Sequence, residues 1–306
     1  MDDSLLTPDA GIPGLDVWSR CLLRYARCAL WLPGRKSAFR KFRRRRSGSR
    51  FQVFTKHQFW MSGEIGDSVE NQVAVFGEFE SGLSRLIKAV ARRTNSFVDL
   101  GCNIGYFSCL YGVSHRRGRI LAVDANPRMA ERCRENLRLN SIDARVLNLA
   151  AGDADGTVVL NVPRGRPTRG TLGRIDANPA NSMRLEVQMR PLESILNQEG
   201  MATVELMKVD IEGYELKLFQ SWRHEFAARF GVIVFEFSEP NLRQCGSSRE
   251  DLTRIPWLDQ FHLFALDETS GRLTPVSPGL LGGADRTLLL HRHDTPSILP
   301  ADSLGG

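Results

Sequence analysis

The stretch Ser96-Phe-Val-Asp99-Leu-Gly101-Cys-Asn103-Ile-Gly105-Tyr-Phe-Ser108 decides the fold of this 306-residue chain. It reads as a strand, a glycine-rich turn and the start of a helix. Glycines at 101 and 105 let the backbone approach a ligand without an intervening Cβ, and a helix start offers N–H groups to a carboxylate. The spacing is not the dinucleotide signature GxGxxG, because Asn and Tyr occupy positions 103 and 106. The turn therefore favours a ligand without a pyrophosphate; an ordinary tight turn is the alternative.

Short apolar runs alternate with helical patterns beyond this turn. Such alternation is typical of a mostly parallel sheet covered by helices on both faces, so we expect an α/β fold with a seven-stranded sheet and an antiparallel edge. The strands are expected at Ser96–Leu100, Arg119–Val123, Ala144–Ala150, Val204–Val209, Val232–Phe237, Phe261–Ala265 and Thr287–Leu290, with the last two as an antiparallel edge pair. Helices are expected at Tyr106–Val113, at Pro127–Leu139 and from Tyr214 to Trp222, and a hairpin-like insertion at Thr157–Val162 and Leu185–Met189.

The positive charge of the chain is confined to its N-terminal arm. Residues 1–50 hold twelve Lys or Arg against four acidic residues, a net charge of +8, whereas the remainder holds 29 against 31, a net charge of −2. Composition divides the chain into a basic, partly disordered arm at 1–50, a globular domain at 51–296 and a flexible tail at 297–306.

The arm combines arginine with apolar residues. Arg20, Arg24 and Arg27 would share one face of a helix, and eight basic residues follow within Arg35–Arg46. The first interpretation of residues 15–50 is that they bind an anionic membrane surface. The second is that they bind nucleic acid, a partner that we do not expect. A solvated tail or a helix packed on the domain is the alternative to both.

The remaining composition points to a cytoplasmic protein. Met1 is followed by two aspartates rather than a basic and apolar signal segment, and arginines interrupt the apolar residues of the arm. Peripheral attachment at the inner membrane face would be compatible with this location. The six cysteines, at 21, 28, 102, 109, 133 and 245, form no CxxC pair and accompany no histidine cluster, so we expect reduced thiols and no metal site.

Acidic residues follow the second and third strands, where ligands bind in such sheets. Asp124, next to Ala125, ends the second strand, and a carboxylate there can accept hydrogen bonds from both hydroxyls of a ribose. Asp153 follows the third strand and can accept from an adenine amine. The alternatives are a helix N-cap before Pro127 for Asp124 and ordinary turn chemistry for Asp153.

The segment Lys208-Val-Asp210-Ile-Glu212-Gly213-Tyr-Glu215 follows the fourth main strand and concentrates negative charge at the same edge. Glu236 ends the fifth strand and points to the same rim. A helix cap with acids in its first turn is the alternative interpretation of this segment. Two carboxylates and a glycine at this position favour a functional site.

These motifs together resemble the FkbM-like methyltransferases. The resemblance runs from about Glu64 to Glu239, and it includes the glycine-rich turn, Ala150-Ala-Gly-Asp153, the string from Lys208 to Glu215, and an upstream segment that ends at Glu80. It implies a class I methyltransferase (Rossmann-like) fold, S-adenosylmethionine as methyl donor, and O-methylation of a hydroxyl on a sugar, a glycolipid or another natural product. Cys102 and Asp124 depart from the family, which commonly has Ala and Glu there.

The resemblance also implies residue roles. The methionine end of the cofactor would be held by Asp99, Gly101, Asn103 and Gly105, the ribose by Asp124 with Ala125, and the adenine edge by Asp153, with Glu80 and Asp210 as further contacts. A hydroxyl acceptor benefits from a base. Asp210 or Glu212 is the predicted base, and Glu80 is a third candidate.

Two other function classes compete with this prediction. A non-catalytic module associated with a membrane or with nucleic acid could retain the fold without turnover; the intact glycine turn and Asp124 speak against it. A nicotinamide-dependent oxidoreductase is disfavoured by the missing GxGxxG.

Overall fold

The computed structural model describes residues 16–19, 21–22, 35–163, 170–173, 182–281, 286–294 and 298–299. Its centre is an eight-stranded sheet with the order β12-β11-β13-β10-β9-β3-β4-β5. Five neighbouring strands are parallel: β5 (Arg145–Asn148), β4 (Arg119–Asp124), β3 (Ser96–Leu100), β9 (Val204–Val209) and β10 (Phe230–Phe237). Antiparallel pairing then adds β13 (Arg286–Arg292), β11 (Phe261–Leu266) and β12 (Leu273–Pro275).

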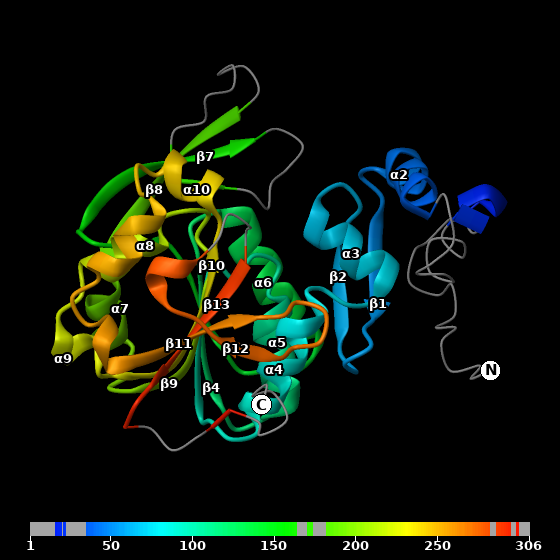
Figure 1. Ribbon diagram of the computed structural model, residues 1–306. Helices are drawn as coiled ribbons and strands as arrows, with labels where there is room; N and C mark the ends of the chain where they lie inside the picture. The colour runs from blue at the N-terminus through cyan, green and yellow to red at the C-terminus, as the bar shows by residue number, and fades with distance from the viewer. Residues whose placement is uncertain are drawn as a thin grey trace.

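Helices cover both faces of this sheet (Figure 1). One face carries α4 (Ser81–Ala91), α5 (Tyr106–Ser114) and α6 (Pro127–Leu139); the other carries α7 (Leu192–Gln198), α8 (Glu215–Gln220) and α9 (His224–Ala227). Side chains of a strand alternate between faces. Phe97 accordingly joins the core under α4–α6, while Val98 and Leu100 join the core under α7–α9. The remaining helical segments follow β10 along the chain: α10 (Glu239–Gln244) and the 3₁₀ turns η3 (Arg249–Arg254), η4 (Leu258–Gln260) and η5 (Pro278–Leu280).

The predicted α/β architecture is confirmed, with two differences in the strands. All seven expected strands lie in the sheet, and the short β12 adds an eighth by pairing with β11. The run expected as one strand at Ala144–Ala150 is divided into β5 and β6 (Ala150–Gly152). β6 leaves the main sheet because it pairs with β8 (Ser182–Pro191). The expected hairpin is present as β7 (Gly156–Pro163) paired antiparallel to β8.

The segment before the main sheet packs on α6. It comprises α2 (Arg35–Arg46), the hairpin β1 (Arg50–Phe54) and β2 (Trp60–Glu64), and α3 (Ser68–Phe76). The N–H of Ser62 in β2 donates to Asn136 Oδ1 of α6 over 2.8 Å.

Within the predicted basic arm, α2 is a helix packed on the domain, since Phe42 is fully buried and the ring of Phe39 lies 5.6 Å from that of Phe76. Arg20, Arg24 and Arg27, the predicted basic face of a preceding helix, lie outside the described residues.

Burial of Phe42 predicts that α2 is part of the cooperative fold. Replacing Phe42 with Ala should lower the free energy of unfolding by about 3–5 kcal/mol, the usual cost of deleting a buried aromatic side chain. Urea denaturation measures this change. Lys41→Ala, an exposed neighbour, should change stability by less than about 0.5 kcal/mol; equal, small effects of both changes would show that α2 is detached in solution.

Candidate functional site

The ends of β3, β4, β9 and β10 meet at one edge of the sheet, and the glycine turn after β3 closes against β9. Gly101 has φ +72°, and a Cβ placed on it would lie 1.7 Å from the carbonyl oxygen of Asp210. The Asp210 N–H in turn donates to the Leu100 carbonyl over 3.0 Å. Only glycine therefore allows the turn and the end of β9 to lie this close.

Two cavities share this edge. The first, here the inner cavity, combines the glycine turn with an apolar wall; it is lined among others by Gly101, Asn103, Asp124, Ala125, Met129, Leu149, Ala150, Leu160, Asp210 and Glu212. The second, here the rim cavity, is more polar; it is lined among others by Gln72, Glu80, Gly101, Asn103, Phe107, Lys208, Asp210, Glu212 and Glu236. Because Gly101, Asn103, Asp210 and Glu212 line both, the cavities are neighbours.

Asp124 lies in the inner cavity with its carboxylate already oriented. Its two oxygens accept the backbone N–H groups of Asn103 and Asn126, each over 2.8 Å. Asn148 Nδ2 holds the following turn by donating to the carbonyls of Asp124 and Ala125. Burial raises the pKa of Asp124 to about 6, and the two N–H groups oppose that rise. A ligand with hydroxyl donors would complete the hydrogen bonds of this carboxylate.

A buried lysine links the two strands beneath the rim. Lys208 Nζ donates to Asp210 Oδ2 over 3.1 Å and lies 3.9 Å from Asp99 Oδ1. Burial disfavours the ammonium, but the charges of Asp210, Asp99 and Glu80 raise the Lys208 pKa above its usual value. Asp99, 1% exposed, also accepts a hydrogen bond from Ser108 Oγ over 2.6 Å. Asp99 thus lies under the site, next to Lys208, rather than among the residues that line the two cavities.

Asn241 orients two carboxylates of the rim. Its Nδ2 donates to Glu212 Oε2 and to Glu236 Oε2, each over 3.1 Å. Glu212 itself has φ +53°, a left-handed conformation that is uncommon outside glycine. The carbonyl of Glu212 accepts the hydroxyl of Thr171 over 2.9 Å, which fixes this turn from the other side.

Glu80 enters the rim cavity from the loop before α4. Its backbone is left-handed, with φ 42° and ψ 72°. Burial, with the like charge of Asp210, raises the pKa of Glu80 to about 8, while Lys208 opposes this rise.

Three of the residues at this edge share an unusual backbone. Among the described non-glycine residues with positive φ are Glu80, Asn103 and Glu212, and all three line the rim cavity. Strained residues of this kind concentrate at functional sites. The sequence did not signal this strain.

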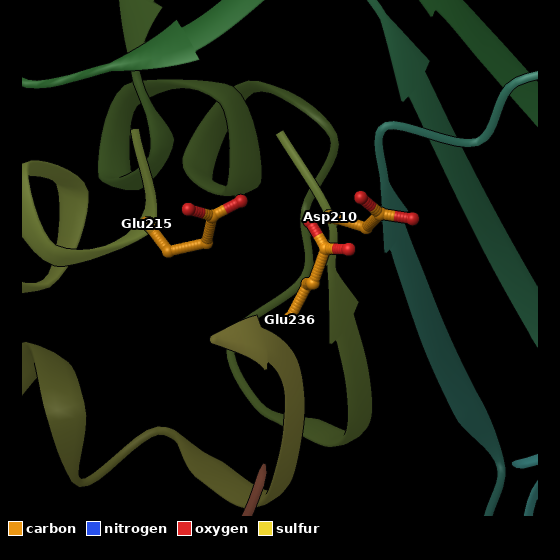
Figure 2. A group of neighbouring side chains, drawn as sticks. All are labelled: Asp210, Glu215 and Glu236. Atoms are coloured by element: carbon orange, nitrogen blue, oxygen red, sulfur yellow. The ribbon is translucent and has the colours of Figure 1, made fainter. Parts of the chain in front are cut away.

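Three acidic side chains surround the end of β9 (Figure 2). Asp210, Glu215 and Glu236 bring carboxylate oxygens within 4.8 Å of one another and are the group that could hold a metal ion within the described residues. Glu215 already accepts the N–H groups of Ile211 and Gly213, and burial raises its pKa to about 8. Its hydrogen bonds give Glu215 a structural role in the turn after β9.

Besides Asp99, two predicted site residues lie apart from the two cavities. Asp153 is exposed and accepts the Tyr214 hydroxyl over 2.7 Å; it lines a separate surface hollow beside Gly156 and Tyr214. Gly105 begins α5 with φ +80°, where a Cβ would lie 2.7 Å from Cys133 Sγ. Gly105 therefore shapes the turn through packing.

Lys208 and Asn241 have no role assigned by sequence reasoning. A lysine inside the otherwise apolar run at the end of β9 is the signal that identifies Lys208, since a buried ammonium requires partners. The sequence around Asn241 has no such contrast between one polar residue and apolar neighbours.

The chain is similar in sequence to known methyltransferases. A family model described as the methyltransferase FkbM domain matches residues 99–264, more than half of the chain. The methyltransferase sdnD of Sordaria araneosa is 25% identical over 172 residues, which cover 47% of this chain and 66% of that protein. A carboxy-S-adenosyl-L-methionine synthase of Shewanella piezotolerans is 32% identical over 79 residues, covering 25% and 32%. The chain thus spans less than two thirds of the length of either relative.

A solved structure also resembles the chain. The tRNA (uracil-54, C5)-methyltransferase of Pyrococcus abyssi, in complex with S-adenosyl-L-homocysteine, is 14% identical, with a TM-score of 0.40 over 79% of this chain and 43% of that one.

The contact between Gly101 and β9 predicts a strong effect of a single methyl group. Gly101→Ala should destabilise the protein by more than about 1–2 kcal/mol, the cost of a left-handed conformation alone, because the added Cβ also meets the Asp210 carbonyl. Thermal unfolding measures the loss. Gly156→Ala, where a Cβ meets no atom within 4 Å, is the matched control and should leave the melting temperature nearly unchanged; similar melting temperatures for both variants would refute the packing argument.

Proposed function

This chain belongs to the FkbM family of S-adenosylmethionine-dependent methyltransferases, and we propose that it methylates a hydroxyl group on a sugar, a glycolipid or another natural-product acceptor. The observation that carries the proposal is the pair of adjoining cavities at Gly101, Asn103 and Asp210. The inner cavity has the chemistry of a nucleoside site, and the rim cavity offers carboxylates to a polar acceptor.

The inner cavity fits S-adenosylmethionine by its donors and walls. Asp124 presents two carboxylate oxygens for ribose hydroxyls, and Met129, Leu149 and Leu160 form an apolar wall for adenine. Asn103 and Gly101, at the boundary of the two cavities, would hold the methionine end. When bound, this cofactor supplies a methyl group on a sulfonium, which carries its own leaving group. The chain then needs to align the acceptor and to accept its proton.

The rim cavity supports a hydroxyl acceptor. Glu80, Asp210 and Glu212, the three carboxylates that sequence analysis names as candidate bases, all line it. Enzymes that methylate a nitrogen of nucleic-acid bases place an Asn/Asp-Pro-Pro-aromatic turn after the strand equivalent to β9, whereas Asp210-Ile-Glu212-Gly213 stands here. A proton acceptor at this position suits a hydroxyl, which must lose a proton when it is methylated.

The cofactor assignment predicts the effect of removing Asp124. Calorimetric titration of the full-length protein with S-adenosylhomocysteine should give micromolar binding, and Asp124→Ala should weaken it about 10- to 100-fold, because hydrogen bonds to a charged group contribute about 1.5–3 kcal/mol. The side chain of Asp155 is 73% exposed, so Asp155→Ala is the control and should bind normally. Equal affinity of the two variants would remove Asp124 from the cofactor site.

Methyl transfer itself is tested with S-adenosylmethionine labelled in the methyl group. Label should appear in glycan, glycolipid or small-molecule fractions, in a product that resists mild acid and base as an ether does. Cofactor binding without transfer to any fraction would favour the non-catalytic alternative, and binding of NADH in place of S-adenosylhomocysteine would contradict the family's chemistry.

We also propose that α2 binds an anionic membrane surface. Its exposed residues include Arg40, Arg43 and Arg44, opposite the buried Phe42. Trp18 is 72% exposed. It lies close in the chain to Asp16, which forms an ion pair of 3.3 Å with Arg45 of α2. Arginine beside exposed tryptophan suits a phospholipid headgroup layer. In the part of the chain that the structure describes, no helix has the length and apolarity to cross a membrane.

Vesicle co-sedimentation tests this surface. Arg40, Arg43 and Arg44 changed together to Gln should weaken binding to phosphatidylserine-containing vesicles by about 100-fold, at about 1 kcal/mol for each basic residue. The matched control for net charge changes three exposed arginines elsewhere to Gln: Arg116, Arg117 and Arg138. Equal losses from both sets, or no pelleting of the unmodified protein, would contradict a membrane site on α2; retention on RNA instead would favour a nucleic-acid partner.

A further inference from the structure

The carboxylates of the rim differ in their partners. Asp210 forms a hydrogen-bonded ion pair with Lys208, and Glu212 and Glu236 share the amide of Asn241. The carboxylate of Glu80 makes no hydrogen bond and no ion pair shorter than 4 Å with any residue that the structure describes. A carboxylate that is engaged with a cation is a weaker base than one that is not.

We propose that Glu80 is the group that takes the proton from the acceptor hydroxyl. This inference rests on the proposed O-methylation and selects among its three candidate bases. Asp210 then positions and neutralises Lys208, and Glu212 shapes the turn after β9.

The loop that carries Glu80 is held in place on both sides. Ser84 Oγ donates to the Phe79 carbonyl over 2.6 Å, and the Gly82 N–H donates to the Glu268 carbonyl over 2.8 Å. A Cβ on Gly82 would lie 2.6 Å from that carbonyl, so the loop packs directly on the Glu268 backbone. These contacts maintain the left-handed backbone of Glu80, and a fixed base needs little reorganisation during reaction.

Glu80 also faces space on two sides. It lines the rim cavity with Asn103 and Asp210, and it lines an adjoining hollow with Glu236, Glu268 and Arg286. An acceptor that enters through this hollow would pass Glu80 before it reaches the inner cavity.

The charges around Glu80 match the task. Asp210, Glu236 and Glu268 face it with like charge, and Lys208 faces it with opposite charge. Burial is the largest influence, and the net result is a pKa of about 8. A general base is most effective when its pKa lies near the working pH, whereas an ordinary glutamate, with a pKa of about 4.3, is a poor acceptor for a hydroxyl proton.

The chemical balance of the step is simple. The acceptor oxygen forms a bond to the methyl carbon while the bond from that carbon to sulfur breaks, and the electron pair of that bond stays on sulfur. Glu80 accepts the hydroxyl proton and becomes a neutral carboxyl group. The products are a methyl ether and a neutral thioether, and no oxidant or reductant is required.

The competing role for Glu80 is to bind the ammonium group at the methionine end of the cofactor. The two roles predict different affinities. If Glu80 faces the acceptor, the affinity of Glu80→Gln for S-adenosylhomocysteine should stay within about threefold of that of the unmodified protein. If Glu80 binds the ammonium group, this affinity should fall about tenfold or more, at about 1.4 kcal/mol per factor of ten.

The test uses the full-length protein saturated with S-adenosylhomocysteine and labelled with ¹³C at the glutamate carboxyl carbon. The resonance that disappears in Glu80→Gln should titrate with a midpoint near 8, and the variant should retain its affinity for S-adenosylhomocysteine by calorimetry. With whichever probe fraction accepts labelled methyl, Glu80→Gln should lose about 10²–10⁴-fold in turnover. The unmodified protein should gain activity as the pH rises toward 8, because only ionised Glu80 accepts a proton.

Glu78→Gln, two residues away and paired with Lys56 and His57, is the matched control and should retain turnover. A tenfold or greater loss of S-adenosylhomocysteine affinity in Glu80→Gln, a midpoint below about 5, or full turnover of the variant would each overturn the inference. Failure of the unmodified protein to bind S-adenosylhomocysteine would instead overturn the proposed function, and the inference with it.

Discussion

The ion pair between Lys208 and Asp210, with Asp99 behind it, is the interaction on which the site depends. Lys208 is 4% exposed, and burying an uncompensated charge costs several kcal/mol. Asp99 lies opposite Lys208 in the register of β3 and β9 and supplies the second negative charge from within the sheet. The pair therefore couples strand register to the rim: any slip of β9 against β3 would separate the ammonium from its partners and displace Asp210 from the glycine turn.

The same constraint explains the unusual backbones at the rim. Gly101 must lie against the Asp210 carbonyl, so the chain after β3 turns sharply, and Asn103 adopts φ +53°. Glu80 and Glu212 are left-handed as well, each held by contacts from a neighbouring loop. Such conformations cost about 1–3 kcal/mol each. They persist because the sheet and its two cores fix the segments on either side.

Local patterns predicted the fold well, and long-range pairing set the limit. Pro127–Leu139 was predicted with its observed bounds because proline and apolar spacing mark a helix within the segment itself. The division of Ala144–Ala150 was not predicted, since β6 is defined by pairing with β8, some forty residues later. Likewise, the sequence predicted Glu80, Asp210 and Glu212 as candidate bases, but ranking them required knowing that Lys208 pairs with Asp210 and that Asn241 donates to Glu212. Asp153, which follows β6, and Asp99, which lies within β3, show the same limit, because a position near the end of a strand does not determine where a side chain points.

The charge distribution of the rim connects its structure to its chemistry. Four carboxylates, from Glu80, Asp210, Glu212 and Glu236, border the rim cavity, and Lys208 is the lysine among its lining residues in the described chain. Since Lys208 is committed to Asp210 and Asp99, the excess negative charge acts on Glu80 and strengthens its hold on a proton. The same excess of negative charge would favour a cationic ligand in the neighbouring inner cavity, and so would favour the sulfonium of the cofactor over the neutral thioether that methyl transfer leaves. Under the role proposed for Glu80, proton uptake would offset this preference, because it would remove one negative charge from the rim as the positive charge on sulfur is lost.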